Sequence, residues 1–329
     1  MFRTALALYL GSIVLLAADR NAAPVINLEL QGKITGAASL RTLRVNLFGV
    51  EIPYVESAEV NRSGEFRFHS LAPGNYTVAV IRKNLCEVRR TVVVSAAVAD
   101  QSGVVHVSIP YTSSEAAANP NGGVVSVHQL SVPANASAKY TEAQKRLAMH
   151  DPEGAIRILE EAVAIAPQFA TAWNALGVIA FQAGDYGQAE TLFRKSLAAE
   201  PGAFEPLVNL GGVLLKQAAL QKNAATDALP FNQRAVRDRP EDALANAQLG
   251  MNYFKLNQFD QAEQYLLAAK RLDPAHFSQP QVFLADIYAR RGNRSAAIRE
   301  LEDVLAIRPD GPLADSIRRN LAQLATRAQ

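Results

Sequence analysis

Five prolines close similar blocks of sequence, and their spacing constrains the fold more than any other feature. They are Pro167, Pro201, Pro240, Pro274 and Pro309. The intervals between them are 34, 39, 34 and 35 residues, close to the period of a stacked pair of helices. Twelve residues before each proline stands an alanine, at Ala155, Ala189, Ala228, Ala262 and Ala297. Such an array buries its core between neighbouring units and leaves a long curved surface for a partner.

Other positions recur with the same period. A second series of mostly small residues comprises Ala162, Ser196, Ala235, Ala269 and Val304. Small residues let two antiparallel helices approach, large ones fill the space around that contact, and the proline ends the second helix. The residues predicted to form the core of the repeats are Trp173, Leu176, Gly177, Ala189, Phe193, Gly211, Gly250, Tyr253, Ala262, Tyr288 and Ala297.

These residues resemble the tetratricopeptide repeat over roughly residues 136–311. The resemblance implies five helix pairs, at 136–169, 170–203, 204–242, 243–277 and 278–311, followed by an amphipathic capping helix at 312–329. The third copy is five residues longer than the others. Its excess falls between Gln217 and Asp227, which predicts a longer corner loop with Asp227 as N-cap. Pro230 would then lie within the first turn of the next helix, where proline is tolerated.

The resemblance also implies that the first helix of each pair lines a concave, peptide-binding groove. The residues predicted to line it are Asn174, Val178, Phe181, Asn209, Leu215, Lys216, Met251, Phe254, Lys255 and Arg290. Its middle is apolar and three cations follow one margin, which suits an extended peptide or an amphipathic helix with acidic flanks. Val178 and Leu215 could equally be ordinary core, whereas Met251 and Phe254 are the stronger groove candidates.

Some repeats of this family grip a terminal carboxylate with lysine, arginine and asparagine side chains on successive inner helices. The matching positions hold Asn174, Val178, Asn209, Leu244 and Gln248. The cations are missing, so we do not expect such a clamp.

A different period governs residues 24–111. Apolar and polar residues alternate in several short runs separated by turn residues, as in 65–69 and 76–80, which predicts strands with one buried face. The motif Gly64-x-Phe66-x-Phe68-x-x-Leu71-x-Pro73-Gly74-x-Tyr76 resembles the carboxypeptidase regulatory-like domain. That resemblance implies a transthyretin-type β-sandwich that serves as an accessory module without catalysis.

Residues 112–135 are predicted to be a linker, because the first part is small, polar and rich in Gly and Pro. Alternation returns at 124–132, so this part is either one more docked strand or extended linker. The amino terminus has one cation, Arg3, an apolar run to Leu16 and small residues before Asp19. This layout predicts a signal peptide at 1–18, and therefore export to the periplasm or the extracellular space. The resemblance of the sandwich to a module of exported bacterial proteins implies a bacterial origin.

The sequence offers no constellation that predicts catalysis. Its five histidines are scattered, and none stands at a metal-ligand spacing. The 33 basic and 31 acidic residues give a formal charge of +2, which provides no field to attract nucleic acid. The short basic run Arg89-Arg90 is interpreted as a solvated strand face. We therefore expect no enzyme, no cofactor, no metal, no nucleic-acid partner, and no membrane span once the signal is removed.

The predicted fold is an all-β sandwich followed by an all-α solenoid. The leading hypothesis is an exported, non-catalytic scaffold that binds an unidentified protein or peptide in the concave groove. The alternative is a module that attaches to carbohydrate or the cell envelope through the sandwich, with the repeats as a spacer. A concave side filled by the amino-terminal half, with no route for release, would contradict the leading hypothesis.

Overall fold

The computed structural model describes residues 28–37, 40, 43–82, 85–111, 131–218 and 223–326. The predicted signal peptide and residues 124–130 of the predicted extra strand lie outside these ranges. Residues 131–133 lie in a turn before the first described helix.

The amino-terminal half contains two sheets that enclose one apolar core. The strands are β1 (Leu28–Thr35), β2 (Leu43–Gly49), β3 (Val55–Glu59), β4 (Glu65–Leu71), β5 (Gly74–Arg82), β6 (Leu85–Val94) and β7 (Val104–Pro110). One sheet has the order β4-β1-β7 and the other has the order β3-β2-β5-β6. All pairs are antiparallel except β1 with β7.

The alternation in the sequence places one side of each strand in this core. Leu30, Val45, Phe68, Tyr76 and Val78 are buried there, as a two-residue period requires of strands with one covered face. The turn between β3 and β4 is held by Asn61, whose Oδ1 accepts the backbone N–H groups of Ser63 and Glu65 at 2.9 Å. These contacts explain how the short alternating runs close into a sandwich.

The carboxy-terminal half is a run of antiparallel helices. They are α3 (Ala134–Ala148), α4 (Pro152–Ile165), α5 (Ala170–Gln182), α6 (Tyr186–Ala199), α7 (Phe204–Gln217), α8 (Ala224–Asp238), α9 (Ala243–Lys255), α10 (Phe259–Leu272), α11 (Pro280–Arg290), α12 (Arg294–Ile307) and α13 (Gly311–Thr326). Side-chain caps start four of them, from Asp151, Asp185, Asp242 and Asn293. The predicted fold class is thereby confirmed.

The recurring small residues lie where the paired helices meet. All five alanines of the first series are buried, and so are all five residues of the second. A Cβ built on Gly177 would lie 2.5 Å from the ring of Phe193, so only glycine lets α5 and α6 approach this closely. Gly211 and Gly250 face Asn232 and Leu266 in the same way. The recurring small residues therefore allow the paired helices to pack closely, in addition to providing apolar surface.

The carbonyl group of every repeat-closing proline accepts a side-chain hydrogen bond. The donors are Trp173 for Pro167, Arg234 for Pro201, Asn246 for Pro240, Gln281 for Pro274 and Arg318 for Pro309. Each proline lies two residues beyond the end of the outer helix, where its carbonyl group is outside the helical hydrogen-bond ladder and needs another donor. In three of the five corners the donor comes from the first turn of the next inner helix, and it ties one repeat to the next.

The long third repeat differs from the prediction. Helix α8 begins at Ala224, so Asp227 lies within its first turn and is not the N-cap, a position that Asn223 takes. Pro230 is the seventh residue of α8 and lies inside the helix, beyond the first turn. Its ring nitrogen has no hydrogen to donate, but the side chain faces solvent. The exposed position accommodates the proline without a break in the helix.

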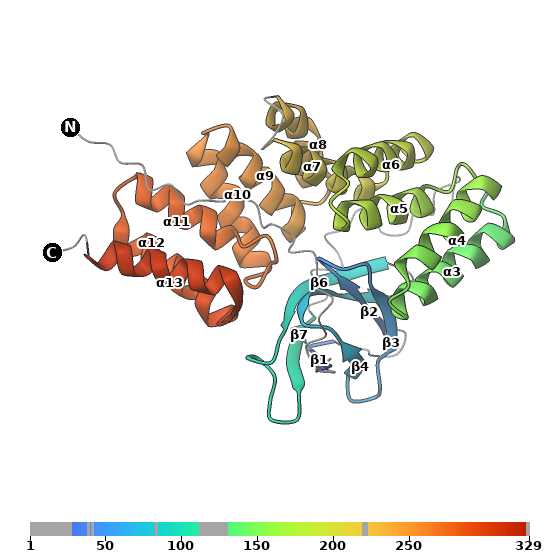
Figure 1. The fold of residues 1–329 in the computed structure, drawn as a ribbon, viewed down its shortest axis with the longest axis horizontal. Coiled ribbons are helices and arrows are strands. Elements are labelled where there is room, and N and C mark those ends of the chain that lie inside the picture. Colours follow the sequence, from blue (N-terminus) through green and yellow to red (C-terminus); the bar gives the residue numbers. More distant parts are fainter. Residues whose placement is uncertain are drawn as a thin grey trace.

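The sandwich and the helical half pack against each other. Figure 1 shows the helices as an arc that runs from α3 to α13, with the sandwich on its concave side. The sheet containing β2 and β6 faces the helices. Most of the helical residues that face it come from the odd-numbered helices α3, α5, α7 and α9.

Candidate binding surface on the inner helices

One end of the sandwich rests on the carboxyl end of α3. The side chain of Val55 on β3 is buried in the same apolar cluster as Ala143 and Leu147. Next to it the ring of Tyr54 stacks on His150, with ring centroids 5.2 Å apart. This is the contact through which the core of the helical array extends into the sandwich.

The loop after β2 is held by the carboxyl end of α5. The Nε2 of Gln182 donates to three backbone carbonyl groups, those of Gly49 at 3.0 Å, Val50 at 3.2 Å and Ile52 at 3.1 Å. Because three acceptors surround the nitrogen, the orientation of this amide is fixed and its Oε1 points away from them. A single glutamine thus anchors an entire loop of the sandwich.

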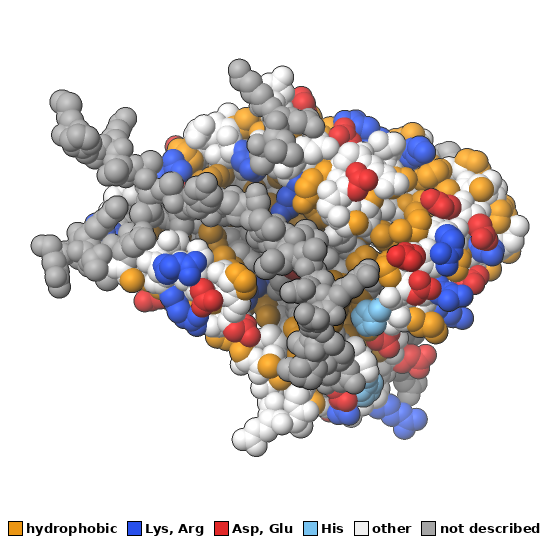
Figure 2. All heavy atoms as spheres, viewed as in Figure 1, with side chains coloured by type: hydrophobic (Ala, Val, Ile, Leu, Met, Phe, Trp, Pro, Cys, Tyr) orange, Lys and Arg blue, Asp and Glu red, His pale blue; other side chains and the backbone are white. Residues whose placement is uncertain are grey.

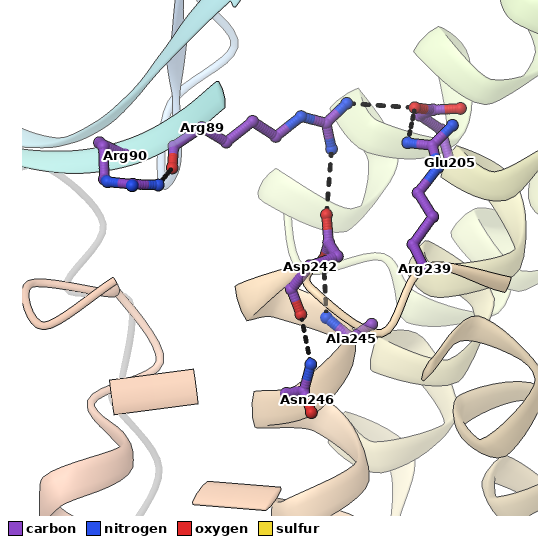
Figure 3. Close-up of polar contacts among 7 residues, drawn as sticks. All are labelled: Arg89, Arg90, Glu205, Arg239, Asp242, Ala245 and Asn246. Atoms are coloured by element: carbon purple, nitrogen blue, oxygen red, sulfur yellow. Dashed lines mark hydrogen bonds and ion pairs between the residues drawn. The ribbon is translucent and has the colours of Figure 1, made fainter. Parts of the chain in front are cut away.

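In the middle of the arc, charged side chains join β6 to the inner helices (Figure 3). The guanidinium of Arg89 lies 3.1 Å from Glu205 at the start of α7 and 4.0 Å from Asp242, the cap of α9. Arg239 approaches Glu205 from the other side, at 3.2 Å. Burial alone would raise the pKa of Glu205, but the charges of Arg89 and Arg239 outweigh it and lower that pKa. This carboxyl group therefore remains ionised as the centre of the contact.

The far part of β6 meets the corner between α10 and α11. The backbone N–H of Thr91 donates to Asp273 Oδ2 at 2.9 Å. Burial raises the pKa of Asp273, against the effect of its hydrogen bonds with Thr91. On the same side Arg308 donates to Asn75 Oδ1 at 3.2 Å and to the carbonyl of Ala275 at 2.8 Å. The edge of β6 is therefore covered by the helical array.

Between these contacts a cavity of about 470 Å³ remains. The sheet side of its wall includes Phe48, Val55, Thr77 and Val88, and the helix side includes Tyr140, Val178, Phe181, Val208 and Leu244. Polar groups interrupt this apolar lining, among them the Asn174–Asn209 pair, joined by a 3.0 Å hydrogen bond. The volume lies within the range of about 300–1,000 Å³ that ligand sites occupy.

Two side-chain amides in the cavity wall lack a partner for their oxygen atom. They belong to Gln182 and Gln248, and each Oε1 is buried without a hydrogen bond among the described residues. Gln248 is 7% exposed, and its amide lies on Gly212, where a Cβ would be 2.5 Å from Nε2. An unpaired buried acceptor costs about 1–3 kcal/mol, so a donor brought by a ligand would be favoured here.

Four of the predicted groove residues line this cavity, and they come from two neighbouring inner helices. They are Asn174, Val178 and Phe181 of α5 and Asn209 of α7. The concave face is nevertheless not open along its length as expected, because the sandwich covers the part on which these residues lie. The amino-terminal half therefore fills part of the concave side, which counts against a fully open groove. The cavity remains between the sandwich and the helices.

Three predicted groove residues lie in the packing between helices instead. Leu215 is 5% exposed and belongs to the apolar cluster of the first repeats, so its assignment to the groove was wrong. Met251 and Phe254 are half-buried against the cluster of α9, α10 and α11, and the ring of Phe254 meets those of Phe259 and Phe283. These side chains pack between neighbouring repeats. The pattern of a single repeat does not show this packing.

The three predicted cations lie outside the cavity. Lys216, Lys255 and Arg290 are exposed at the carboxyl ends of α7, α9 and α11. Asp286 pairs with Arg290 at 3.0 Å. The remaining repeat-core residues are buried or half-buried in the helix packing, as predicted; Tyr253 stacks on Tyr265, and Lys195 lies over the ring of Trp173.

The sandwich side of the surface was not predicted from the sequence. Arg89 was assigned to a solvated strand face, which is wrong, because it pairs with Glu205. Gln182, Glu205, Asp242 and Asp273 carried no signal of their own, since helix ends and corners commonly hold such residues. A contact between positions 116 residues apart leaves no period in a single sequence.

The described residues contain no group of three or more His, Cys, Asp or Glu side chains arranged to hold a metal ion. None of the helices within the described ranges is both long and apolar enough to cross a membrane.

Models of the tetratricopeptide repeat match residues 140–204 and 243–276. Among characterised proteins, the chain is similar to cellulose synthase operon protein C of Xanthomonas axonopodis pv. citri (strain 306), with 29% identity over 197 residues. The match covers 57% of this chain and 13% of that protein. The chain therefore spans a small part of the length of this relative.

Solved structures with similar helices include MamA from Desulfovibrio magneticus RS-1, which is 25% identical with a TM-score of 0.47 and matches 54% of this chain and 97% of its own. YrrB, described as a TPR protein with an unusual peptide-binding site, is 25% identical with a TM-score of 0.45 and matches 59% and 98%. The two family-model matches and the helix pairs lead to one assignment. The helical half of this chain contains tetratricopeptide repeats at residues 140–204 and 243–276, a fold that suggests a scaffold for protein interaction, and it follows a β-sandwich.

Proposed function

We propose that the protein is an exported, non-catalytic scaffold that holds a segment of a partner protein in the cavity between its sandwich and its inner helices. The observation that carries this proposal is the cavity itself, which both halves of the chain line and which includes four residues expected to bind a peptide. The sandwich is then one wall of the site rather than a separate module.

The chemistry of the walls favours a polypeptide segment as the occupant. Apolar side chains line most of the cavity and can take apolar side chains of the partner. The oxygen atoms of Gln182 and Gln248 need N–H donors, and a peptide main chain supplies one at almost every residue. An extended segment satisfies both requirements at once.

Photo-crosslinking in the producing cell tests this proposal. The photoreactive residue p-benzoylphenylalanine replaces Val178, which lines the cavity, and in a control it replaces Leu267, which is 41% exposed on the outer helix α10. We expect a defined protein adduct from position 178 that is absent from position 267, identified by mass spectrometry. The same adducts from both positions, or none from position 178, would contradict the proposal.

Export is tested separately, because it rests only on the residues before Asp19. We expect the mature protein to be recovered outside the cytoplasm with its amino terminus close to Asp19, as determined by cell fractionation and terminal sequencing. A cytoplasmic protein that retains Met1 would remove export from the proposal and leave the cavity unaffected.

A further inference from the structure

Lys216 and Lys255 occupy the same place in successive repeats. They are 39 residues apart, and Arg290 follows 35 residues later. The same intervals separate Gly211, Gly250 and Ala285, which mark the helix contact in each repeat. The three cations therefore form a row along the carboxyl ends of the inner helices α7, α9 and α11, a row that the cavity lining does not include.

The helices that carry the two lysines, α7 and α9, contact each other. Neither Lys216 nor Lys255 forms an ion pair with a carboxylate among the described residues, in contrast to Lys270, which binds Glu300 and Asp303. Both side chains are exposed as a whole, but neighbouring residues partly desolvate the ammonium group of Lys216 and lower its pKa, and the charge of Lys255 lowers that pKa further. Burial also lowers the pKa of Lys255. A cation at a helix carboxyl end gains from the helix dipole, which explains either lysine alone. The helix dipole does not explain why two ammonium groups lie near each other without a carboxylate to balance their charge.

Arg290 completes the row in a different manner. Its guanidinium is bound to Asp286 and lies over the rings of Phe254, at 5.8 Å, and Phe259, at 5.3 Å. The ring of Phe254 meets that of Phe283 at 5.2 Å. Phe254 directly precedes Lys255 at the end of α9, so this half-buried aromatic cluster offers apolar contact close to one of the two unpaired lysines.

The charge distribution favours an acidic peptide over a nucleic acid. The chain carries a formal charge of only +2, and Figure 2 shows basic and acidic side chains interspersed over the end of the array that holds α3 and α4. A nucleic acid depends on many phosphate contacts for its affinity, whereas the row has two unpaired cations. A short polypeptide segment with two carboxylates supplies one partner for each of the two unpaired lysines.

We propose that Lys216 and Lys255, with the aromatic cluster of Phe254, Phe259 and Phe283, form a second binding surface that takes an acidic polypeptide segment through two of its carboxylates. This surface lies outside the cavity and goes beyond the function proposed above. It stands or falls independently of what the cavity holds.

Fluorescence anisotropy with the full chain tests this surface. The probe is a fluorescein-labelled 12-residue peptide with two Glu-Leu pairs in a Gly-Ser background, and a matched peptide has Gln in place of Glu. We expect the Glu peptide to bind at least tenfold more tightly than the Gln peptide at low salt, and the difference to shrink at 0.5 M salt, where charges are screened. The variant Lys216→Ala with Lys255→Ala should weaken binding of the Glu peptide at least tenfold.

Two further variants separate the effect from general loss of charge or fold. Lys145→Ala with Arg237→Ala removes two exposed cations elsewhere and should bind as wild type, while Lys216→Arg with Lys255→Arg should retain binding. Equal binding of the Glu and Gln peptides, no binding by the wild type, or no effect of the double alanine variant would overturn the proposal. So would tighter binding of a 12-nucleotide oligothymidylate than of the Glu peptide.

Discussion

Leu215 and Lys216 are neighbours on α7 with opposite environments. The leucine is 5% exposed within the core cluster of the first repeats, whereas the lysine side chain reaches solvent. Adjacent residues on a helix point about 100° apart, so one faces the neighbouring helices while the next can serve a partner. The binding role inferred for the row of cations therefore does not extend to the residue beside it.

This difference gives a direct test. We expect Leu215→Ala to lower the free energy of unfolding by about 2–4 kcal/mol, because it removes a buried side chain and leaves a cavity. Val178→Ala, at a half-buried position in the cavity wall, should cost less. Urea denaturation followed by circular dichroism measures both losses of unfolding free energy. Equal losses would mean that Leu215 is no more buried than Val178 and belongs to the groove.

His276 shows how the corner beside β6 depends on pH. Burial, aided by the charge of Arg308, lowers the pKa of His276 to about 3, and its Nδ1 accepts the backbone N–H of Ser278 at 3.2 Å. The neutral ring is therefore the folded form. In the unfolded chain a histidine takes up a proton near pH 6.5, so its contribution to stability is complete above that pH and is lost as the pH falls towards 3.

We expect the wild type to lose more stability than His276→Gln between pH 7 and pH 5. The difference in slope should approach about 1.4 kcal/mol per pH unit below pH 6.5. Urea titrations at pH 7, 6 and 5 measure it, with His106→Gln as a control at an exposed histidine. Identical slopes for the wild type and His276→Gln would show that this ring is accessible to protons in the folded state.

At the scale of the elements, the corner of each repeat is a unit of stability. The proline ends the outer helix, and its free carbonyl accepts a side chain, from the next inner helix in three of the five corners. In the fourth corner this donor is Gln281, which is 2% exposed and bonds to Pro274 at 2.7 Å. The period of the prolines could be read from the sequence. The side chains that bind their carbonyl groups could not, because Trp, Asn and Gln have nothing in common except a side-chain N–H group.

We expect Gln281→Met to cost about 1–3 kcal/mol of unfolding free energy, because the similar volume is kept while the Pro274 carbonyl loses its partner. Gln264→Met, on the exposed face of α10, should change stability by less than about 0.5 kcal/mol. Thermal and urea denaturation distinguish these outcomes. An equal, small effect of both substitutions would mean that the corner hydrogen bond does not stabilise the array.

At this scale, the helix pairs and the strands could be predicted from the sequence, but the exact ends of the helices could not. The helix pairs follow from buried alanines and glycines that recur with a fixed period, and the strands follow from alternation around Phe66 and Tyr76. Pro230 was misplaced because helix starts depend on capping geometry, and the boundary of α8 lies a few residues before the expected one. Periodic packing is encoded locally, whereas the exact ends of helices are set by a few hydrogen bonds.

At the scale of the whole molecule, the sandwich lies in the hollow of the repeats. The contact is mostly polar, with Arg89 on Glu205, Gln182 on three carbonyl groups and Thr91 on Asp273, and Val55 supplies a buried apolar contact. No repeat period links the two halves, so their arrangement could not be predicted from the spacing of residues. The position of the sandwich determines which part of the concave face a partner can reach.

Amide hydrogen exchange at Thr91 tests this arrangement most directly. Its N–H lies on the outer edge of β6 and bonds to Asp273 of the helical half, so its protection requires the docked sandwich. We predict slow exchange at Thr91 in the wild type and fast exchange in Asp273→Ala, with Thr77 on the neighbouring strand β5 unchanged in both. Fast exchange at Thr91 in the wild type, with Thr77 protected, would contradict a sandwich held in the concave face.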